Sequence, residues 1–212
     1  MDFEIIKPAD IEKRSFAIIT EELGDRVFPE DIGLVVKRVI HTSADFEYAD
    51  NLVFSEGVVP HALQAIQNGA HIVTDTNMVK AGINKKTLAK FGGEVHCFVA
   101  DPDVAEEAKK RGVTRSTVSM ERAAQLDVPV IFAIGNAPTA LIELDRLMKE
   151  QDLKPELIIG VPVGFVNVVE SKELILRSSA PYIVARGRKG GSNVAAAIVN
   201  ALLYQLVHRE GF

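Results

Sequence analysis

The chain has 212 residues, 47% of them hydrophobic, so it can bury one sizeable core. Its net charge of -5 and isoelectric point near 5.6 argue against general binding to nucleic acid or to a membrane surface. A single cysteine, Cys97, excludes an internal disulfide and a cysteine-based metal cluster. The start resembles no signal peptide and no apolar run approaches membrane-spanning length, so we expect one cytoplasmic domain over 1–212.

Two helices are expected first, near 11–23 and over 29–41. Apolar residues of the second recur at the spacing of an amphipathic helix, and Arg38 and His41, three apart, are neighbours on its surface. His41 falls at the helix C-terminus, where the dipole favours the protonated ring, so we expect a pKa raised toward neutrality. This placement suits a proton donor, although a histidine that only ends the helix is the plain alternative.

Short apolar runs then alternate with helical patterns. Strands are predicted at 71–74, 95–99, 130–134, 157–161 and 182–186. Helices are predicted at 60–67, 85–91, 102–111, 119–125, 139–151, 168–176 and 193–207. Strands that are apolar throughout are typical of a parallel sheet covered on both faces. The sequence therefore predicts a three-layer α/β fold with a mostly parallel sheet and additional N-terminal helices.

Four of the loops that follow these strands are rich in glycine and small polar residues. They span 75–82, 135–141, 160–165 and 187–192. Ligands of such sheets bind beyond the carboxyl ends of the strands. Glycines let the backbone approach a ligand, and the free N–H groups of a helix start bind anions. We therefore expect a large pocket lined mostly by backbone, with several points that hold anions.

The last of these loops matches no standard phosphate motif. Lys189 precedes the glycine pair, so the loop is not a Walker A sequence, and it is not a Gly-x-Gly-x-x-Gly fingerprint either. A tight turn from strand to helix remains open. Arg186, Arg188 and Lys189 favour a carboxylate or phosphate contact at this helix start.

No metal site is expected. His61, His71, His96 and His208 fit no ligand spacing, so we interpret them as structural or surface residues. The acidic stretch with Asp45, Glu47 and Asp50 lacks a glycine turn and is more typical of a solvated loop.

Seven segments together resemble the precorrin-8X methylmutase family, which acts at the corrin-ring stage of vitamin B12 biosynthesis. They lie in the family's order over nearly the whole chain: 14–16, 38–42, 75–82, 114–116, 135–140, 160–165 with 170–173, and 187–196. The resemblance implies a flavodoxin-like fold, a homodimer and an isomerase. Such an enzyme moves a methyl group from carbon 11 to carbon 12 of ring C of one tetrapyrrole, with no external donor, cofactor or protein-bound metal.

The resemblance also implies roles for particular residues. His41 would donate the proton to ring C, while Arg38, Arg115 and Ser15 match positions that line the ligand. Arg115 has a plain alternative, a pair with Glu121. The other expected substrate contacts come from the same segments or from charge and loop location: Thr42, Met78, Lys80, Asn136, Gly164, Arg188, Gly190, Gly191 and Ser192.

Three alternatives concern substrate and activity. The stretch 42–46 looks more like family members that act on a cobalt-containing substrate, which favours cobalt-precorrin-8 over the metal-free form. A corrinoid carrier without catalysis would use the same pocket and cations. A nucleotide-dependent enzyme is disfavoured, because the phosphate fingerprint and an acidic residue for a ribose are missing.

Overall fold

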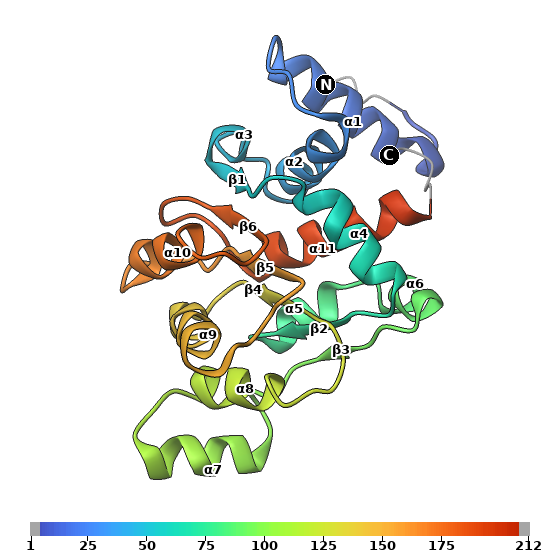
Figure 1. Cartoon of the computed structure of the whole chain (residues 1–212). Coiled ribbons are helices and arrows are strands. Elements are labelled where there is room, and N and C mark those ends of the chain that lie inside the picture. Colours follow the sequence, from blue (N-terminus) through green and yellow to red (C-terminus); the bar gives the residue numbers. More distant parts are fainter. Residues whose placement is uncertain (1–4, 208–212) are drawn as a thin grey trace.

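The computed structural model describes residues 5–207, and a six-stranded sheet lies at its centre (Figure 1). The strands are β1 (Leu52–Phe54), β2 (His71–Thr74), β3 (Val95–His96), β4 (Val130–Ile134), β5 (Leu157–Gly160) and β6 (Tyr182–Ala185). Their order across the sheet is β1-β6-β5-β4-β2-β3. β1 pairs antiparallel with β6, and every other pair is parallel.

The five parallel strands have a flavodoxin-like order. Numbered among themselves from β2 to β6, they run 2-1-3-4-5 across the sheet. The chain order reverses between β2 and β4, and ligands of such folds bind beyond the carboxyl ends of the strands at this switch point. The predicted fold class is confirmed.

Helices cover both faces of the sheet. The elements on one side are α2 (Glu30–Ser43), α4 (Val58–Gln67), α5 (Asn77–Gly82), α6 (Lys85–Leu88) and α11 (Ser192–Leu206), with α1 (Ile11–Leu23) outside α2. The other side carries α8 (Arg115–Ala123), α9 (Pro138–Gln151) and α10 (Val168–Leu176), with α7 (Pro102–Arg111) packed on α8. Short elements complete the chain: η1 (Pro8–Asp10), α3 (Tyr48–Asn51) and η2 (Ala89–Phe91).

Each face of the sheet has its own core. Along β4, Ile131 and Ala133 join the core under α11, whereas Phe132 and Ile134 join the core under α9. All five residues of β4 are buried, as expected of a central parallel strand. The uniform apolar character that predicted a doubly covered sheet therefore has its origin in these two cores.

The structure differs from the sequence prediction in several elements. β1 was not predicted, because three residues on an edge give too short a pattern, and β3 ends at His96 because only Ile72 and Val73 of β2 pair with it. The stretch 77–82 was expected as loop but forms α5, which Thr76 caps by accepting the N–H of Val79 at 3.2 Å. Thr114 likewise caps α8, which therefore begins at Arg115 rather than at residue 119.

Within residues 5–207, no helix combines the length and the apolar character that crossing a membrane requires.

Candidate functional site

Asp75 lies at the switch point, directly after β2. Its carboxylate accepts the backbone N–H groups of Gly135, Asn136 and Ala137 at 2.9, 2.7 and 2.6 Å. Only 1% of Asp75 is exposed, and this burial raises the pKa of the carboxyl above its usual value, while the three N–H groups act in the opposite direction. Asp75 thus fixes the loop after β4 against the end of β2. It was not predicted as a site residue.

The loops after β2, β4, β5 and β6 meet at one edge. Thr76 and Ser192 share a hydrogen bond of 3.0 Å between their hydroxyls, and Gly191 donates its N–H to the carbonyl of Val161 at 2.9 Å. A Cβ atom on Gly190 would lie 2.1 Å from that same carbonyl oxygen, and one on Gly135 would lie 2.7 Å from the Cα of Ser192. Glycine is therefore required at positions 135 and 190 by close backbone approach within the protein itself.

The loop before α8 reaches this edge too. The hydroxyl of Thr114 lies 3.0 Å from that of Thr139, which belongs to the first turn of α9. Arg115 is exposed there, and Glu121 is bound instead by Arg111, with contacts of 2.5 and 2.7 Å, and by Arg146 at 3.5 Å. Within residues 5–207, no ion pair joins Arg115 to Glu121, so that alternative for Arg115 is wrong.

His41 belongs to a second cluster, formed by α1, α2 and α11. Its ring stacks on Phe16 of α1, with 5.4 Å between the ring centroids. Arg38, only 8% exposed, forms an ion pair with Glu12 and lies over the rings of Phe16 and Tyr204 at 4.8 and 5.3 Å. Ser15, next to Phe16, donates its hydroxyl to the carbonyl of Ile11 at 2.9 Å.

The electrostatic expectation for His41 was wrong in direction. His41 is exposed, but partial burial of its ring first, and then the positive charge of Arg38, lower its pKa below 6.5, while Glu12 acts in the opposite direction. The helix dipole alone predicted a rise, but the packing of α1 over the ring was not visible in the sequence. His41 is thus mostly neutral at pH 7 in the free protein.

An ion-pair network joins the two clusters. The ammonium of Lys189, before α11, binds Asp45 at 2.6 Å and Glu47 at 3.0 Å, just after α2. Asp50 pairs with Arg26 at 2.9 Å. The acidic loop was expected to be simply solvated. Glu47 and Asp50 are indeed exposed, but the ion pairs of Lys189 also tie the helix that carries His41 to the glycine loop after β6.

The remaining predicted residues lie around the same edge or at the end of α2. Met78 and Lys80 lie on α5, and Met78 is 71% exposed. The guanidinium of Arg188 lies over the ring of Phe165 at 5.4 Å, and the Arg188 carbonyl accepts the N–H of Gly164 at 3.2 Å. The side chains of Thr42 and Asn136 are exposed. The structure therefore brings most of the predicted residues into two linked clusters.

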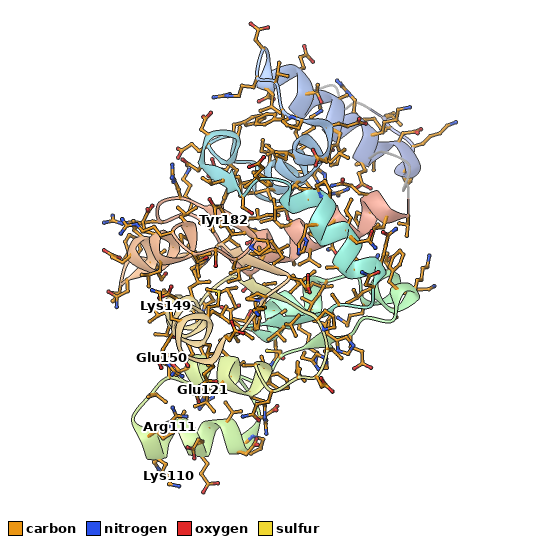
Figure 2. The ribbon with its side chains drawn as sticks, in the orientation of Figure 1. Lys110, Arg111, Glu121, Lys149, Glu150 and Tyr182 are labelled. Carbon is orange, nitrogen blue, oxygen red and sulfur yellow. The ribbon has the colours of Figure 1, made fainter. Side chains whose placement is uncertain are left out.

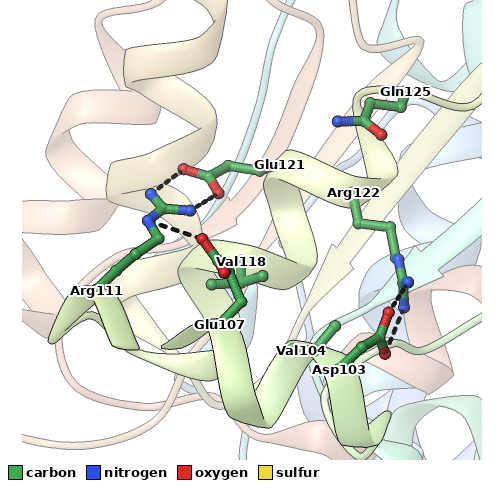
Figure 3. Close-up of a pocket in the computed structure, with 8 residues that line it drawn as sticks. All are labelled: Asp103, Val104, Glu107, Arg111, Val118, Glu121, Arg122 and Gln125. Atoms are coloured by element: carbon green, nitrogen blue, oxygen red, sulfur yellow. Dashed lines mark hydrogen bonds and ion pairs between the residues drawn. The ribbon is translucent and has the colours of Figure 1, made fainter. Parts of the chain in front are cut away.

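A hollow between α7 and α8 lies elsewhere (Figure 3). Its walls hold oppositely charged pairs, Arg111 with Glu121 and Arg122 with Asp103, and no predicted site residue lines it. Figure 2 places Arg111 and Glu121 on these neighbouring helices. Because its charges pair with one another, this hollow offers no free cation to an anionic ligand.

His71 on β2, His96 on β3 and Glu94 just before β3 come together, with one ligand atom from each within 4.8 Å of the others. The expectation that His71 and His96 fit no ligand spacing missed this, because the pairing of β2 with β3 brings His71 beside the stretch 94–96. His208, named in the same expectation, lies outside the described residues. Nδ1 of His71 lies 2.8 Å from Nε2 of His96, so a direct hydrogen bond between the rings accounts for the contact.

The fold and the carboxyl edge of the sheet define a class of protein. It is a flavodoxin-like α/β protein in which the loops after β2, β4, β5 and β6 are fixed against one another. The sequence model of the precorrin-8X methylmutase family matches residues 10–205. The chain belongs to the precorrin-8X methylmutase family, and it is an isomerase of the intramolecular-transferase type.

Curated relatives and a solved structure agree with this assignment. A cobalt-precorrin-8 methylmutase of Priestia megaterium is 47% identical over 93% of this chain and 88% of its own length. A precorrin-8X methylmutase of Pseudomonas aeruginosa is 39% identical over 91% and 93%. The structure of the Thermus thermophilus precorrin-8X methylmutase has a TM-score of 0.86 and 39% identity, and covers 94% of this chain and 98% of that one.

Proposed function

We propose that the chain moves a methyl group from carbon 11 to carbon 12 of ring C of precorrin-8X or cobalt-precorrin-8. The observation that carries this proposal is the family match over residues 10–205, together with relatives named for this reaction class. The cobalt-containing substrate is favoured, because the 47% identical relative is named for it and the 39% identical Pseudomonas relative for the metal-free form.

The rearrangement requires few chemical groups from the protein. The methyl group migrates between adjacent ring carbons, and extension of the conjugated system supplies the driving force. The protein must hold ring C in one protonation state and present one face to the migrating group. A single positioned proton donor contributes about 10²- to 10⁴-fold in rate.

We assign the role of proton donor to His41. Its ring stacks on Phe16 at an interplanar angle of 29°, and Arg38 lies over the same Phe16 ring. The lowered pKa makes the protonated ring a stronger acid, which transfers its proton readily to a ring C nitrogen or its conjugated neighbour. The same lowered pKa makes the protonated form scarce at pH 7, and the carboxylates of a bound substrate would raise its population.

The substrate carries acetate and propionate arms, so it is a polyanion that needs cations. Arg115 and Arg188 are exposed at the sheet edge, with Lys80 on α5 beside it. We assign substrate carboxylates to these residues, together with the start of α11 at Ser192. Arg38 would bind a substrate carboxylate in place of its present ion-pair partner, Glu12. Ser15, Thr42, Met78, Asn136, Gly164, Gly190 and Gly191 complete the proposed contacts.

A time course of absorbance tests the proposal. The native protein is mixed with metal-free or cobalt-loaded precorrin-8 pigment, and the spectrum is followed. Conversion to the spectrum of the rearranged corrin, faster with the cobalt form, is the expected result. Tight binding without any spectral conversion would favour the alternative, a carrier that holds the pigment and passes it on.

A further inference from the structure

Lys172 is a buried lysine to which the proposed reaction gives no role. It lies on α10 with 1% of its surface exposed, and its ammonium donates to the carbonyl oxygens of Gly187 and Lys189, both at 2.8 Å. Burial lowers the pKa of this lysine to about 8. An ammonium group in a core costs folding free energy, so its presence there needs a reason other than stability.

The two acceptors flank a third carbonyl that is also hydrogen-bonded within the protein. The carbonyl of Arg188, between them, accepts the N–H of Gly164 at 3.2 Å. Three consecutive carbonyl oxygens, from residues 187–189, are thus bound to the protein's own donors. A carbonyl oxygen that is bound in this way cannot present its negative dipole to a carboxylate, which suits a loop that must attract one.

The loop also connects the two clusters of the site. Arg188 lies over Phe165, and Lys189 reaches Asp45 and Glu47 after α2. A loop of this kind, with glycines at 187, 190 and 191, has little stiffness of its own. The buried ammonium supplies two charge-assisted hydrogen bonds that fix it.

We propose that Lys172 is a positioning residue for substrate binding: by holding the carbonyls of residues 187–189, it sets Arg188 for a substrate carboxylate and keeps Lys189 on the loop after His41. This inference rests on the proposed function. It assigns Lys172 an effect on substrate affinity and no part in the methyl shift itself.

The test compares Lys172→Met, which keeps the length and removes the donors, with Lys149→Met, an exposed lysine of α9 paired with Asp145. We expect KM for the pigment to rise at least tenfold in Lys172→Met, with kcat within threefold of the native value, and neither to change in Lys149→Met. A fall of kcat of that size in Lys172→Met at unchanged KM would overturn the proposal, and so would a kcat and KM equal to those of the native protein.

A double-mutant cycle separates positioning from general stability. If Lys172 acts through the loop, Arg188→Met adds less than twofold to the KM of Lys172→Met, although alone it raises KM severalfold. Fully multiplicative effects would count against the proposal. Lys172→Gln, which keeps an N–H donor on a shorter side chain, is expected between the native protein and Lys172→Met, and it replaces that variant if Lys172→Met does not fold.

A readout without substrate keeps the two proposals apart. Amide hydrogen exchange in residues 186–191 should be at least tenfold faster in Lys172→Met than in the native protein or in Lys149→Met. Unchanged exchange in these residues would refute the claim that Lys172 holds the loop, whatever the activity of the variant. If the native protein neither binds nor converts the pigment, the proposed function fails, and faster exchange would still establish what holds the loop.

Discussion

Beside partial burial, two opposite charges act on the ionisation of His41, one from its own helix and one from α1. Arg38 lowers its pKa and Glu12 raises it, beside the larger effect of burial. We therefore expect the pKa of His41 to rise in Arg38→Met and to fall further in Glu12→Gln. Two-dimensional NMR of the ring protons against pH measures both, and shifts in the opposite directions would contradict this electrostatic account.

The lowered pKa of His41 also predicts how the rate and the stability depend on pH. If the protonated ring is the donor, kcat/KM should rise as pH falls from 8 toward the pKa of His41, which lies below 6.5. The unfolded chain binds this proton more readily than the folded chain, so protonation of His41 makes the free energy of unfolding fall as pH drops below about 6.5. A kcat/KM that falls over the same range would argue for a neutral His41 acting as base.

Asp75 is the residue on which the loop after β4 depends. In Asp75→Asn one oxygen acceptor becomes an NH₂ group that faces backbone N–H donors, so buried donors lose their partner. We expect the free energy of unfolding to fall by about 2 to 4 kcal/mol. Urea unfolding measures it, with the exposed Asp127→Asn as control, and equal stability of the two variants would contradict the role given to Asp75.

At the scale of elements, the loop after β6 is shaped by backbone contact as much as by charge. A methyl group on Gly190 would lie 2.1 Å from the carbonyl oxygen of Val161, whereas one on Gly57 meets nothing within 4 Å. We expect Gly190→Ala to cost about 3 kcal/mol, against about 1 kcal/mol for Gly57→Ala, where only a positive φ opposes alanine. Thermal unfolding of both variants checks the order, and a larger loss in Gly57→Ala would contradict it.

The elements with strong periodicity were predictable from the sequence. The central strand β4 and helix α9 lie within one residue of the predicted limits, because a run of buried apolar residues and a long amphipathic pattern leave few alternatives. Edge strand β1 and helix α5 were missed, because three or six residues carry too little pattern.

The site residues were predictable only in part. Loop composition pointed to the carboxyl edge of the sheet, where the loops do meet. Asp75 and Lys172 were not predicted, since their hydrogen-bond partners lie 60 to 62 and 15 to 17 residues away, which no local pattern reveals. The direction of the His41 pKa shift was misjudged for two reasons: Phe16 packs on the ring from another helix, and the positive charge of Arg38 was left out of the expectation.

At the scale of the whole molecule, we predict a homodimer, as the family resemblance implies. Large apolar side chains stand exposed near the candidate site, Phe165 and Val166 at 79% each and Met78 at 71%. Exposed large apolar side chains are typical of a contact surface when they form one patch, as they would across a dimer interface. Sedimentation equilibrium at micromolar concentration should give twice the 23.1 kDa chain mass, and a single-chain mass would refute the prediction.

The central claim is that this molecule is a methylmutase whose proton donor is His41. The most direct measurement is a single-turnover absorbance trace of cobalt-precorrin-8 with the native protein, His41→Asn and His61→Asn, the last being a surface histidine paired with Glu156 at 3.0 Å. We predict that His41→Asn binds the pigment but converts it at least about 100-fold more slowly, while His61→Asn matches the native rate. Conversion by His41→Asn at the native rate would contradict the account.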